Sequence, residues 1–138
     1  GDADMDAMRK TLDGLKEGKI LGMSPEGTRN KTGKLLRAYP GIVMLAIRSG
    51  APLIPLAHWG GEKFKTNLKK FKRTDFYTRV GDQFVIKADG IKLDKDARQI
   101  IADELMYQLA ALLPEEYRGK YTDLSNATTN YLQFSRNL

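Results

Sequence analysis

The chain has 138 residues and a mass of 15.5 kDa, which is the size of a single domain. Apolar residues make up 41% and charged residues 29%, which excludes disordered and collagen-like chains. The net charge of +6 favours an anionic partner, without choosing among nucleic acid, a phosphate-bearing small molecule and an acidic membrane surface. The absence of cysteine excludes disulfides and thiol nucleophiles, and the single histidine, His58, excludes multi-histidine metal sites.

The first half of the chain predicts two helices and two strands around a long polar loop. In chain order the pattern predicts a helix over 2–15, a buried strand over 20–23, a loop over 24–39, a helix over 40–48 and a strand over 53–57. A strand, a helix and a second strand in this order predict one βαβ unit with a parallel pair of strands. Pro55 lacks a backbone N–H, so we expect its strand to lie at a sheet edge or to be bulged.

The second half predicts a basic loop, two short strands and a long helix. We expect the basic loop over 60–73 and the two strands over 77–80 and 84–87, joined as a possible hairpin. The helix is expected over 95–113, where Asp94 can cap its start. Residues 119–138 are rich in Asn and Thr, and we expect this tail to be partly disordered. The predicted fold is therefore α/β, with a mixed, partly parallel sheet flanked by helices.

The loop over 24–39 is the segment with the clearest chemistry. It follows the first predicted strand, and ligands in parallel α/β sheets bind beyond the carboxyl ends of the strands. Arg29 can make bidentate hydrogen bonds to a phosphate, and Gly27 lets the backbone approach a ligand closely. Glu26 could orient Arg29 or accept hydrogen bonds from a substrate hydroxyl. The alternative is a polar surface loop with a local Glu–Arg pair, and spacing alone leaves both open.

Three segments resemble one family of enzymes. Pro25-Glu26-Gly27-Thr28-Arg29 closely resembles the P-E-G-T-R block of the glycerol-phosphate and lysophosphatidic acid acyltransferases. Residues 49–56 resemble the family's later block, a glycine turn followed by a strand with a central proline. Residues 80–84 resemble its G-[ED]-P-[FIL] segment, with Gln83 in place of the usual proline. The resemblance covers roughly residues 2–113 and implies a glycerolphosphate acyltransferase-like fold.

The resemblance implies a function in phospholipid biosynthesis. Members of the family transfer a fatty acyl group from acyl-CoA or acyl carrier protein to a hydroxyl of a glycerol-phosphate lipid. By this resemblance Arg29 would hold the substrate phosphate, with Glu26, Gly27 and Thr28 shaping that site. Pro52, Ile54 and Pro55 would support the acyl or substrate site. The implied partners are a lysophospholipid and an acyl donor that serves as co-substrate, and the chemistry requires neither a metal nor a tightly bound cofactor.

The sequence departs from the family pattern in one respect. Family members carry a His-x-x-x-x-Asp motif, in which the histidine is the general base and the aspartate orients it. Here His58 is followed five residues later by Lys63, so the motif is absent. We therefore expect residues 1–118 to be the C-terminal part of an acyltransferase domain that is truncated at its N-terminal side. Such a chain is expected to have little or no activity alone, and to associate with the missing N-terminal half or with itself.

A basic segment with interleaved aromatic residues lies in the middle of the chain, over residues 63–79. Its positive side chains include Lys69, Lys70, Lys72 and Arg73, which are candidate contacts for an anionic membrane or for the phosphates of CoA. This predicts a cytoplasmic protein at the peripheral face of a membrane. The alternatives are a solvated basic loop and a non-catalytic α/β module that binds anionic lipid or nucleic acid, although no recognised nucleic-acid-binding signature occurs.

Overall fold

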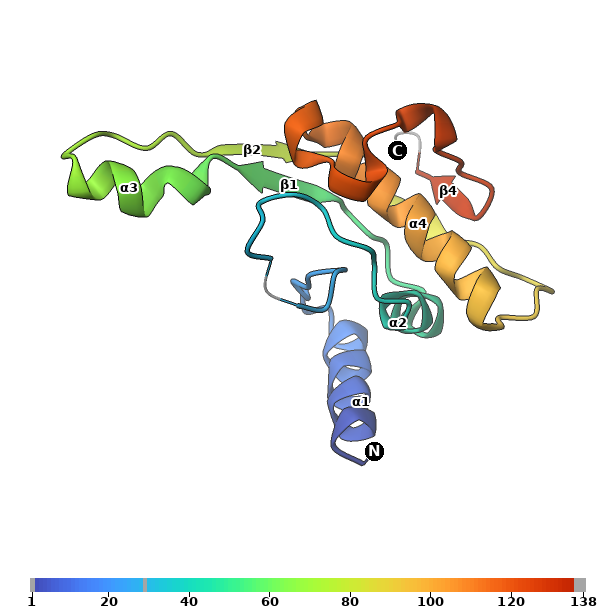
Figure 1. The fold of residues 1–138 in the computed structure, drawn as a ribbon. Helices are drawn as coiled ribbons and strands as arrows, with labels where there is room; N and C mark the ends of the chain where they lie inside the picture. Colours follow the sequence, from blue (N-terminus) through green and yellow to red (C-terminus); the bar gives the residue numbers. More distant parts are fainter. Residues whose placement is uncertain (1, 29, 136–138) are drawn as a thin grey trace.

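The computed structural model describes residues 2–28 and 30–135 (Figure 1). Its helices are α1 (Asp2–Lys16), α2 (Gly41–Ser49), α3 (Phe64–Lys69) and α4 (Lys95–Leu112). Its strands are β1 (Leu56–Trp59), β2 (Tyr77–Val80), β3 (Phe84–Ile86) and β4 (Leu132–Phe134). Short 3-10 turns lie at Gly61–Lys63, Glu115–Tyr117, Gly119–Tyr121 and Leu124–Asn126. None of the helices in the described ranges has the length and apolar character needed to span a membrane.

The three helices predicted from periodicity are confirmed, as α1, α2 and α4. Asp94 caps α4, because its carboxylate accepts a hydrogen bond from the amide of Ala97 at 2.9 Å. Gly50 ends α2 in the left-handed region with φ 60°, and its amide donates to the carbonyl of Ala46. Local capping chemistry therefore sets the start of α4 and the end of α2.

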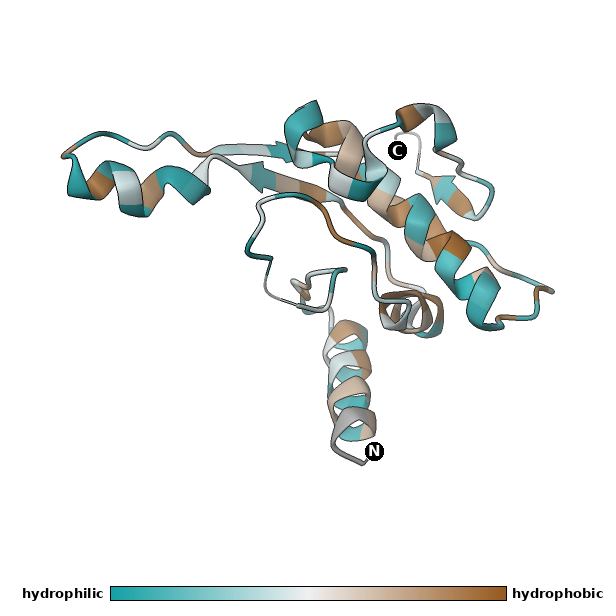
Figure 2. Ribbon diagram, in the orientation of Figure 1, coloured by the Kyte–Doolittle hydropathy of each residue, from teal (hydrophilic) through white to brown (hydrophobic). Residues whose placement is uncertain are grey.

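The core lies between α2, α4 and the β3–β4 sheet. Its largest fully buried apolar side chains are Val43, Phe84, Ile101 and Met106, each at most 2% exposed. Figure 2 shows hydrophobic residues along most of α2 and alternating with hydrophilic residues along α4. We call the unit formed by α2, α4 and the β3–β4 sheet the body of the protein. It holds the loop that precedes α2 and the segment that follows α2.

The predicted parallel pair of strands is wrong, although the mixed α/β character is confirmed. Both sheets are two-stranded and antiparallel, β1 with β2 and β3 with β4. Residues 20–23 form no strand, and Ile20 is 99% exposed. A strand requires a hydrogen-bonded neighbour, and in the described part of the chain no segment pairs with these residues. Local apolar character alone therefore misled the prediction.

The predicted hairpin between 77–80 and 84–87 is also wrong, because both strands pair elsewhere. Leu56 pairs with Val80 in the β1–β2 sheet, and Leu53 bridges Phe84. Between these two pairs, two residues (54 and 55) oppose three (81–83), which is the pattern of a β-bulge. Pro55 thus lies at a bulge, as its missing N–H predicts, and its carbonyl accepts a hydrogen bond from Gly81 at 2.9 Å.

The predicted disorder of the tail is wrong for residues 119–135. Tyr121 is 4% exposed and Leu132 is 8% exposed, and both belong to the core. Strand β4 pairs with β3 in a register that places Leu132 opposite Ile86. Polar residues in this segment make specific hydrogen bonds to α4, which the composition does not reveal. Residues 136–138 lie outside the described residues.

An arm extends from the body along β1 and β2. In Figure 1, α3 lies at the far end of this two-stranded ribbon, away from α2 and α4. The predicted basic loop over 60–73 therefore contains a 3-10 turn at Gly61–Lys63 and the short helix α3. The arm holds the basic segment at a distance from the loop that carries the P-E-G-T-R block.

Candidate functional site

The loop between α1 and α2 carries the residues predicted to form the substrate-phosphate site. Glu26 is half-buried, whereas Gly27 and Thr28 are exposed to solvent. Arg29, the predicted phosphate ligand, lies outside the described residues. The amide of Gly27 donates to the carbonyl of Ser24 at 3.2 Å, so a tight turn precedes the position of Arg29.

Gly27 requires glycine for two reasons. Its φ of 66° lies in the left-handed region, which residues other than glycine rarely adopt. A Cβ at this position would also lie 3.2 Å from the Cβ of Tyr39. The amide of Tyr39 donates to the carbonyl of Pro25 at 2.7 Å, so the block is held against the residues that precede α2.

Asn30 organises the rest of this loop. Its side-chain oxygen accepts hydrogen bonds from the amide of Thr32 at 2.9 Å and from the amide of Gly33 at 3.1 Å. Its side-chain nitrogen donates to the Glu26 carboxylate at 3.1 Å and to the carbonyl of Lys34. Sequence reasoning did not assign this role, although Asn before Thr and Gly is typical of a turn in which the Asn side chain bonds the backbone. The Glu26 carboxylate is thus already held in place.

The far side of the loop is attached to the C-terminal segment. The amide of Leu35 donates to the carbonyl of Tyr117 at 2.9 Å, and the carbonyl of Leu35 accepts from the amide of Lys120 at 3.3 Å. The amide of Ala38 donates to the hydroxyl of Tyr121, which itself donates to Asp103 on α4 at 2.8 Å. Burial raises the pKa of Tyr121, so this phenol stays a neutral donor. The tail therefore positions the candidate site.

The later block predicted to support the acyl or substrate site forms the bulge before β1. Pro52 and Ile54 are exposed, Ile54 by 58%, whereas Pro55 is buried. No hydrogen bond in the described ranges joins residues 52–55 to residues 26–28. The structure thus leaves Pro52 and Ile54 accessible to a ligand and gives Pro55 a packing role.

An open hollow of about 430 Å³ lies beside the loop, on the side of the C-terminal segment. It is lined by Lys34, Glu115, Glu116, Gly119 and Thr122. Two carboxylates against one ammonium group disfavour an anionic ligand there. The hollow is therefore not the predicted phosphate site. Among the residues that the structure describes, no group of three or more His, Asp or Glu side chains could hold a metal ion.

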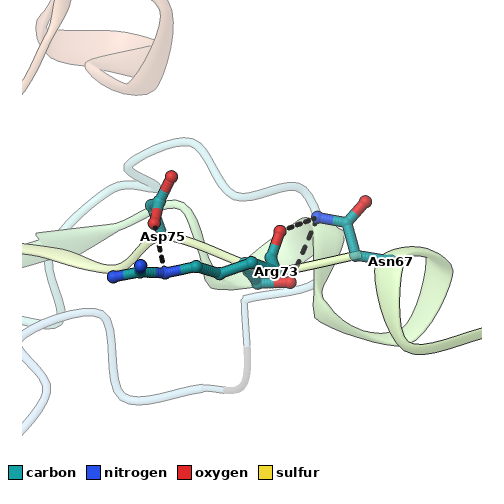
Figure 3. Close-up of polar contacts among 4 residues, drawn as sticks. Asn67, Arg73 and Asp75 are labelled. Atoms are coloured by element: carbon teal, nitrogen blue, oxygen red, sulfur yellow. Dashed lines mark hydrogen bonds and ion pairs between the residues drawn. The ribbon is translucent and has the colours of Figure 1, made fainter. Parts of the chain in front are cut away.

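The predicted membrane or CoA contacts gather at the end of the arm. Lys69 ends α3, and Lys70, Lys72 and Arg73 lie in the turn that leads back toward β2, all of them exposed. Figure 3 shows the contacts that fix this turn, including the ion pair between Arg73 Nε and Asp75 Oδ1 at 3.3 Å. The structure therefore brings these four basic residues together, at a site separate from the loop over 24–39.

The base of the arm is braced by an aromatic stack. The rings of Trp59 and Tyr77 stack across the β1–β2 sheet with centroids 5.5 Å apart. The guanidinium of Arg79 lies 5.2 Å from the Trp59 ring centroid and donates to the carbonyl of Leu112 at the end of α4. These contacts hold the ribbon against the body.

One further contact links the arm to the C-terminal segment. The hydroxyl of Tyr117 donates to Glu62 Oε1 at 2.6 Å. This hydrogen bond lowers the pKa of the Glu62 carboxyl and raises the pKa of Tyr117 to about 12. Both groups therefore keep the protonation states that the bond requires throughout the neutral range.

Comparison with known proteins gives two matches. The profile of the Acyltransferase family matches residues 2–59, which contain both the P-E-G-T-R block and the later proline block. The chloroplastic 1-acyl-sn-glycerol-3-phosphate acyltransferase BAT2 of Brassica napus is 25% identical over 122 residues, which cover 88% of this chain and 30% of that protein. No solved structure matches the chain. Residues 2–59 of the chain are thus similar to the Acyltransferase family, and the chain as a whole is similar to part of a 1-acyl-sn-glycerol-3-phosphate acyltransferase, of which it spans less than a third.

Proposed function

We propose that this chain provides the acceptor-phosphate site of an acyltransferase that acts on lysophosphatidic acid or a related glycerol phosphate. The observation that carries the proposal is the Pro25–Arg29 block, which lies inside the sequence region that matches the Acyltransferase family. The name of the Brassica napus relative supports this class of substrate. Arg29 binds the phosphate, and Glu26, Gly27 and Thr28 shape the site around it.

The conformation of the loop supports this role. The turn at Gly27 leaves backbone and the Thr28 side chain exposed next to Arg29. Asn30 holds the Glu26 carboxylate, which prevents that negative charge from moving freely toward a bound phosphate. A guanidinium forms two parallel charge-assisted hydrogen bonds to a phosphate, which a lysine ammonium cannot reproduce. The loop is thus suited to hold an acceptor by its phosphate.

The proposed reaction is acyl transfer from a thioester to an alcohol. A general base removes the proton of the acceptor hydroxyl, and the oxygen attacks the thioester carbonyl of acyl-CoA or acyl carrier protein. The C–O bond forms, the C–S bond breaks, and the thiol leaves with the proton. The sequence of this chain holds no His-x-x-x-x-Asp motif, so we expect it to bind the acceptor while showing little or no transfer by itself. The exposed side chains of Pro52 and Ile54 are available to the lipid part of the substrate.

The Arg29→Ala variant should bind glycerol 3-phosphate roughly tenfold to a hundredfold more weakly than the unchanged chain, because charge-assisted hydrogen bonds are lost. Arg29→Lys should recover only part of the affinity, because one ammonium group cannot bind the phosphate bidentately. Isothermal titration calorimetry with glycerol 3-phosphate measures both effects.

Arg37→Ala is the matched control, because Arg37 is an exposed arginine of the same loop and lies outside the P-E-G-T-R block. It should leave the affinity within about twofold of the unchanged chain, as expected for a charge that does not touch the ligand. Equal losses for the two alanine variants would show that the loop attracts phosphate only through its overall charge. Binding that survives Arg29→Ala unchanged would contradict the role given to Arg29.

A further inference from the structure

We propose that the end of the arm docks onto a lipid bilayer with anionic headgroups. The docking surface, called the arm tip below, consists of three apolar and four basic residues. These are Phe64, Leu68 and Phe71, with Lys69, Lys70, Lys72 and Arg73. The inference rests on the geometry and charge of this tip and does not require the acceptor site to bind phosphate.

The apolar side chains of the arm tip face water. Phe64 is 47% exposed, Leu68 is 61% exposed and Phe71 is 99% exposed. Phe64 and Leu68 are four residues apart in α3 and therefore lie on one face of that helix. A side chain as exposed as Phe71 stands on a convex surface, where it can enter a flat layer but cannot be enclosed by a small ligand. The tip thus presents apolar area to a large, deformable surface.

The backbone holds Phe71 in this position at a cost in strain. Phe71 has a φ of 52°, a left-handed conformation that bulky residues rarely adopt and that persists only where the surroundings impose it. Its amide donates to the carbonyl of Leu68 at 3.2 Å. An aromatic residue kept strained and fully exposed contributes nothing to the core, which points to a role outside the folded chain.

Asn67 imposes this conformation from the inner side of the turn. Its carbonyl accepts hydrogen bonds from the amides of Lys70 at 3.0 Å and Lys72 at 2.8 Å. Its side-chain nitrogen donates to the hydroxyl of Thr74 at 3.1 Å and to the carbonyl of Arg73 at 3.4 Å, as Figure 3 shows. The turn is therefore ordered before any partner binds, which lowers the entropy cost of docking.

The charges around Phe71 complement an anionic surface. Between residues 62 and 75 the chain has six basic residues and two acidic ones, Glu62 and Asp75. Glu62 accepts a hydrogen bond from Tyr117, and Asp75 pairs with Arg73. The lysines that flank Phe71 therefore face solvent with their charge uncompensated by these two carboxylates. Apolar residues surrounded by basic ones are the pattern of segments that lie in the interface of an anionic membrane.

The position of the tip also fits docking at a bilayer. Figure 1 shows α3 at the far end of the β1–β2 ribbon, so the tip can touch a surface while the body remains in water. A nucleic acid would use the basic residues but would gain little from Leu68, because its outer surface is charged phosphate. The combination of exposed apolar and basic side chains therefore favours a membrane over nucleic acid.

Sedimentation of the full chain with vesicles tests the proposal. The chain should bind phosphatidylcholine vesicles that contain about one third phosphatidylserine and should not bind vesicles of phosphatidylcholine alone. Phe71→Ala should weaken binding roughly tenfold, because the aromatic area no longer enters the interface. Lys70→Gln combined with Lys72→Gln should weaken it roughly 25-fold, about fivefold for each charge removed near the surface.

Matched controls come from the body of the protein. Lys92→Gln combined with Lys95→Gln removes two exposed charges, and Ile100→Ala removes an apolar side chain that is 50% exposed. Both controls should bind within about twofold of the unchanged chain, since neither site belongs to the tip. Circular dichroism shows that each variant is folded. Equal losses for tip and control variants, or equal binding to neutral vesicles, would overturn the proposal.

A fluorescent reporter distinguishes insertion from simple charge attraction. Trp59 is the only tryptophan of the chain, so a variant with Trp59→Phe and Phe71→Trp carries its single indole at the tip. Its emission should shift to the blue with anionic vesicles and should be quenched by brominated lipid chains. Unchanged emission on vesicle-bound protein would refute insertion. Tighter binding to a duplex oligonucleotide than to vesicles, with no effect of Phe71→Ala, would assign the tip to nucleic acid instead.

Discussion

Replacing Glu104 by alanine should lower the free energy of unfolding by about 3 kcal/mol, because three donors lose their buried acceptor. Glu104 lies on α4, is 2% exposed and is the buried charged residue of the described core. Its carboxylate accepts hydrogen bonds from the hydroxyl of Thr128 at 2.6 Å and from the amides of Asn130 at 2.8 Å and Tyr131 at 3.0 Å. It thereby fixes the segment that leads into β4.

Urea unfolding, monitored by circular dichroism, measures this loss of stability. Hydrogen exchange at the Tyr131 and Leu132 amides shows where in the chain it occurs. Glu104→Gln should cost about half as much, because the amide oxygen can still accept while its nitrogen cannot. Glu116→Ala is the control, since Glu116 is exposed, and it should change stability by less than about 0.5 kcal/mol. A Glu104→Ala variant with full stability and a protected Tyr131 amide would refute the anchoring role.

Replacing Gly119 by alanine should lower the free energy of unfolding by about 2–4 kcal/mol and should also weaken phosphate binding. Gly119 has a φ of 54°, and a Cβ there would overlap the carbonyl oxygen of Leu35. Relief of that overlap requires Leu35 to move, which breaks its hydrogen bonds to Tyr117 and Lys120. The loop over 24–39 then loses its attachment to the C-terminal segment.

Gly90→Ala separates the backbone strain from the contact with Leu35. Gly90 has a φ of 72° and open space around its missing side chain, so alanine there should cost only about 1 kcal/mol. Thermal unfolding compares the two variants, and calorimetry with glycerol 3-phosphate should show weaker binding for Gly119→Ala alone. Equal stability losses for the two variants would mean that the contact between Gly119 and Leu35 does not restrain the loop.

The sequence predicted the elements whose signals are local. Asp94 and the spacing of Ile101 and Leu105 mark α4, and Pro40 and Gly50 mark α2. Strand pairing depends instead on distant partners, and it was predicted wrongly. Phe84 pairs with Phe134, fifty residues later in the chain, and no local sequence pattern identifies that partner. The apolar residues 20–23 have the composition of a strand but lack a neighbour in the described structure, and no strand forms.

The tail shows why polar composition misled the prediction. Thr128 and Asn130 are residue types that are common in disordered segments. Here both donate hydrogen bonds to the carboxylate of Glu104 on α4. One signal for this contact was present in the sequence. Glu104 lies three residues after Ile101 and one before Leu105, so it falls on the apolar face of the predicted helix. A charge on that face needs a buried partner, and the tail supplies it.

The candidate site was predicted from a motif and not from packing. The prediction took Glu26, Gly27, Thr28 and Arg29 from the P-E-G-T-R block, and this block lies within the residues that match the Acyltransferase family. The residues that shape the loop, Asn30 and Tyr39, were not assigned a role, because their contacts depend on the folded loop. The separation between this loop and the basic tip also follows only from the course of β1 and β2 (Figure 1).

Titration of the isotopically labelled chain with glycerol 3-phosphate, monitored by ¹H–¹⁵N NMR, shows whether the loop before α2 binds the acceptor phosphate. Binding at the loop should give saturable shifts of the amides of Gly27, Thr28 and Asn30 and leave the tip amides of Lys70 and Lys72 unchanged. In the Arg29→Ala variant the same shifts should need roughly tenfold to a hundredfold more ligand. Shifts confined to the arm tip, or none at all as the ligand is raised, would contradict the claim that the loop before α2 binds the acceptor phosphate.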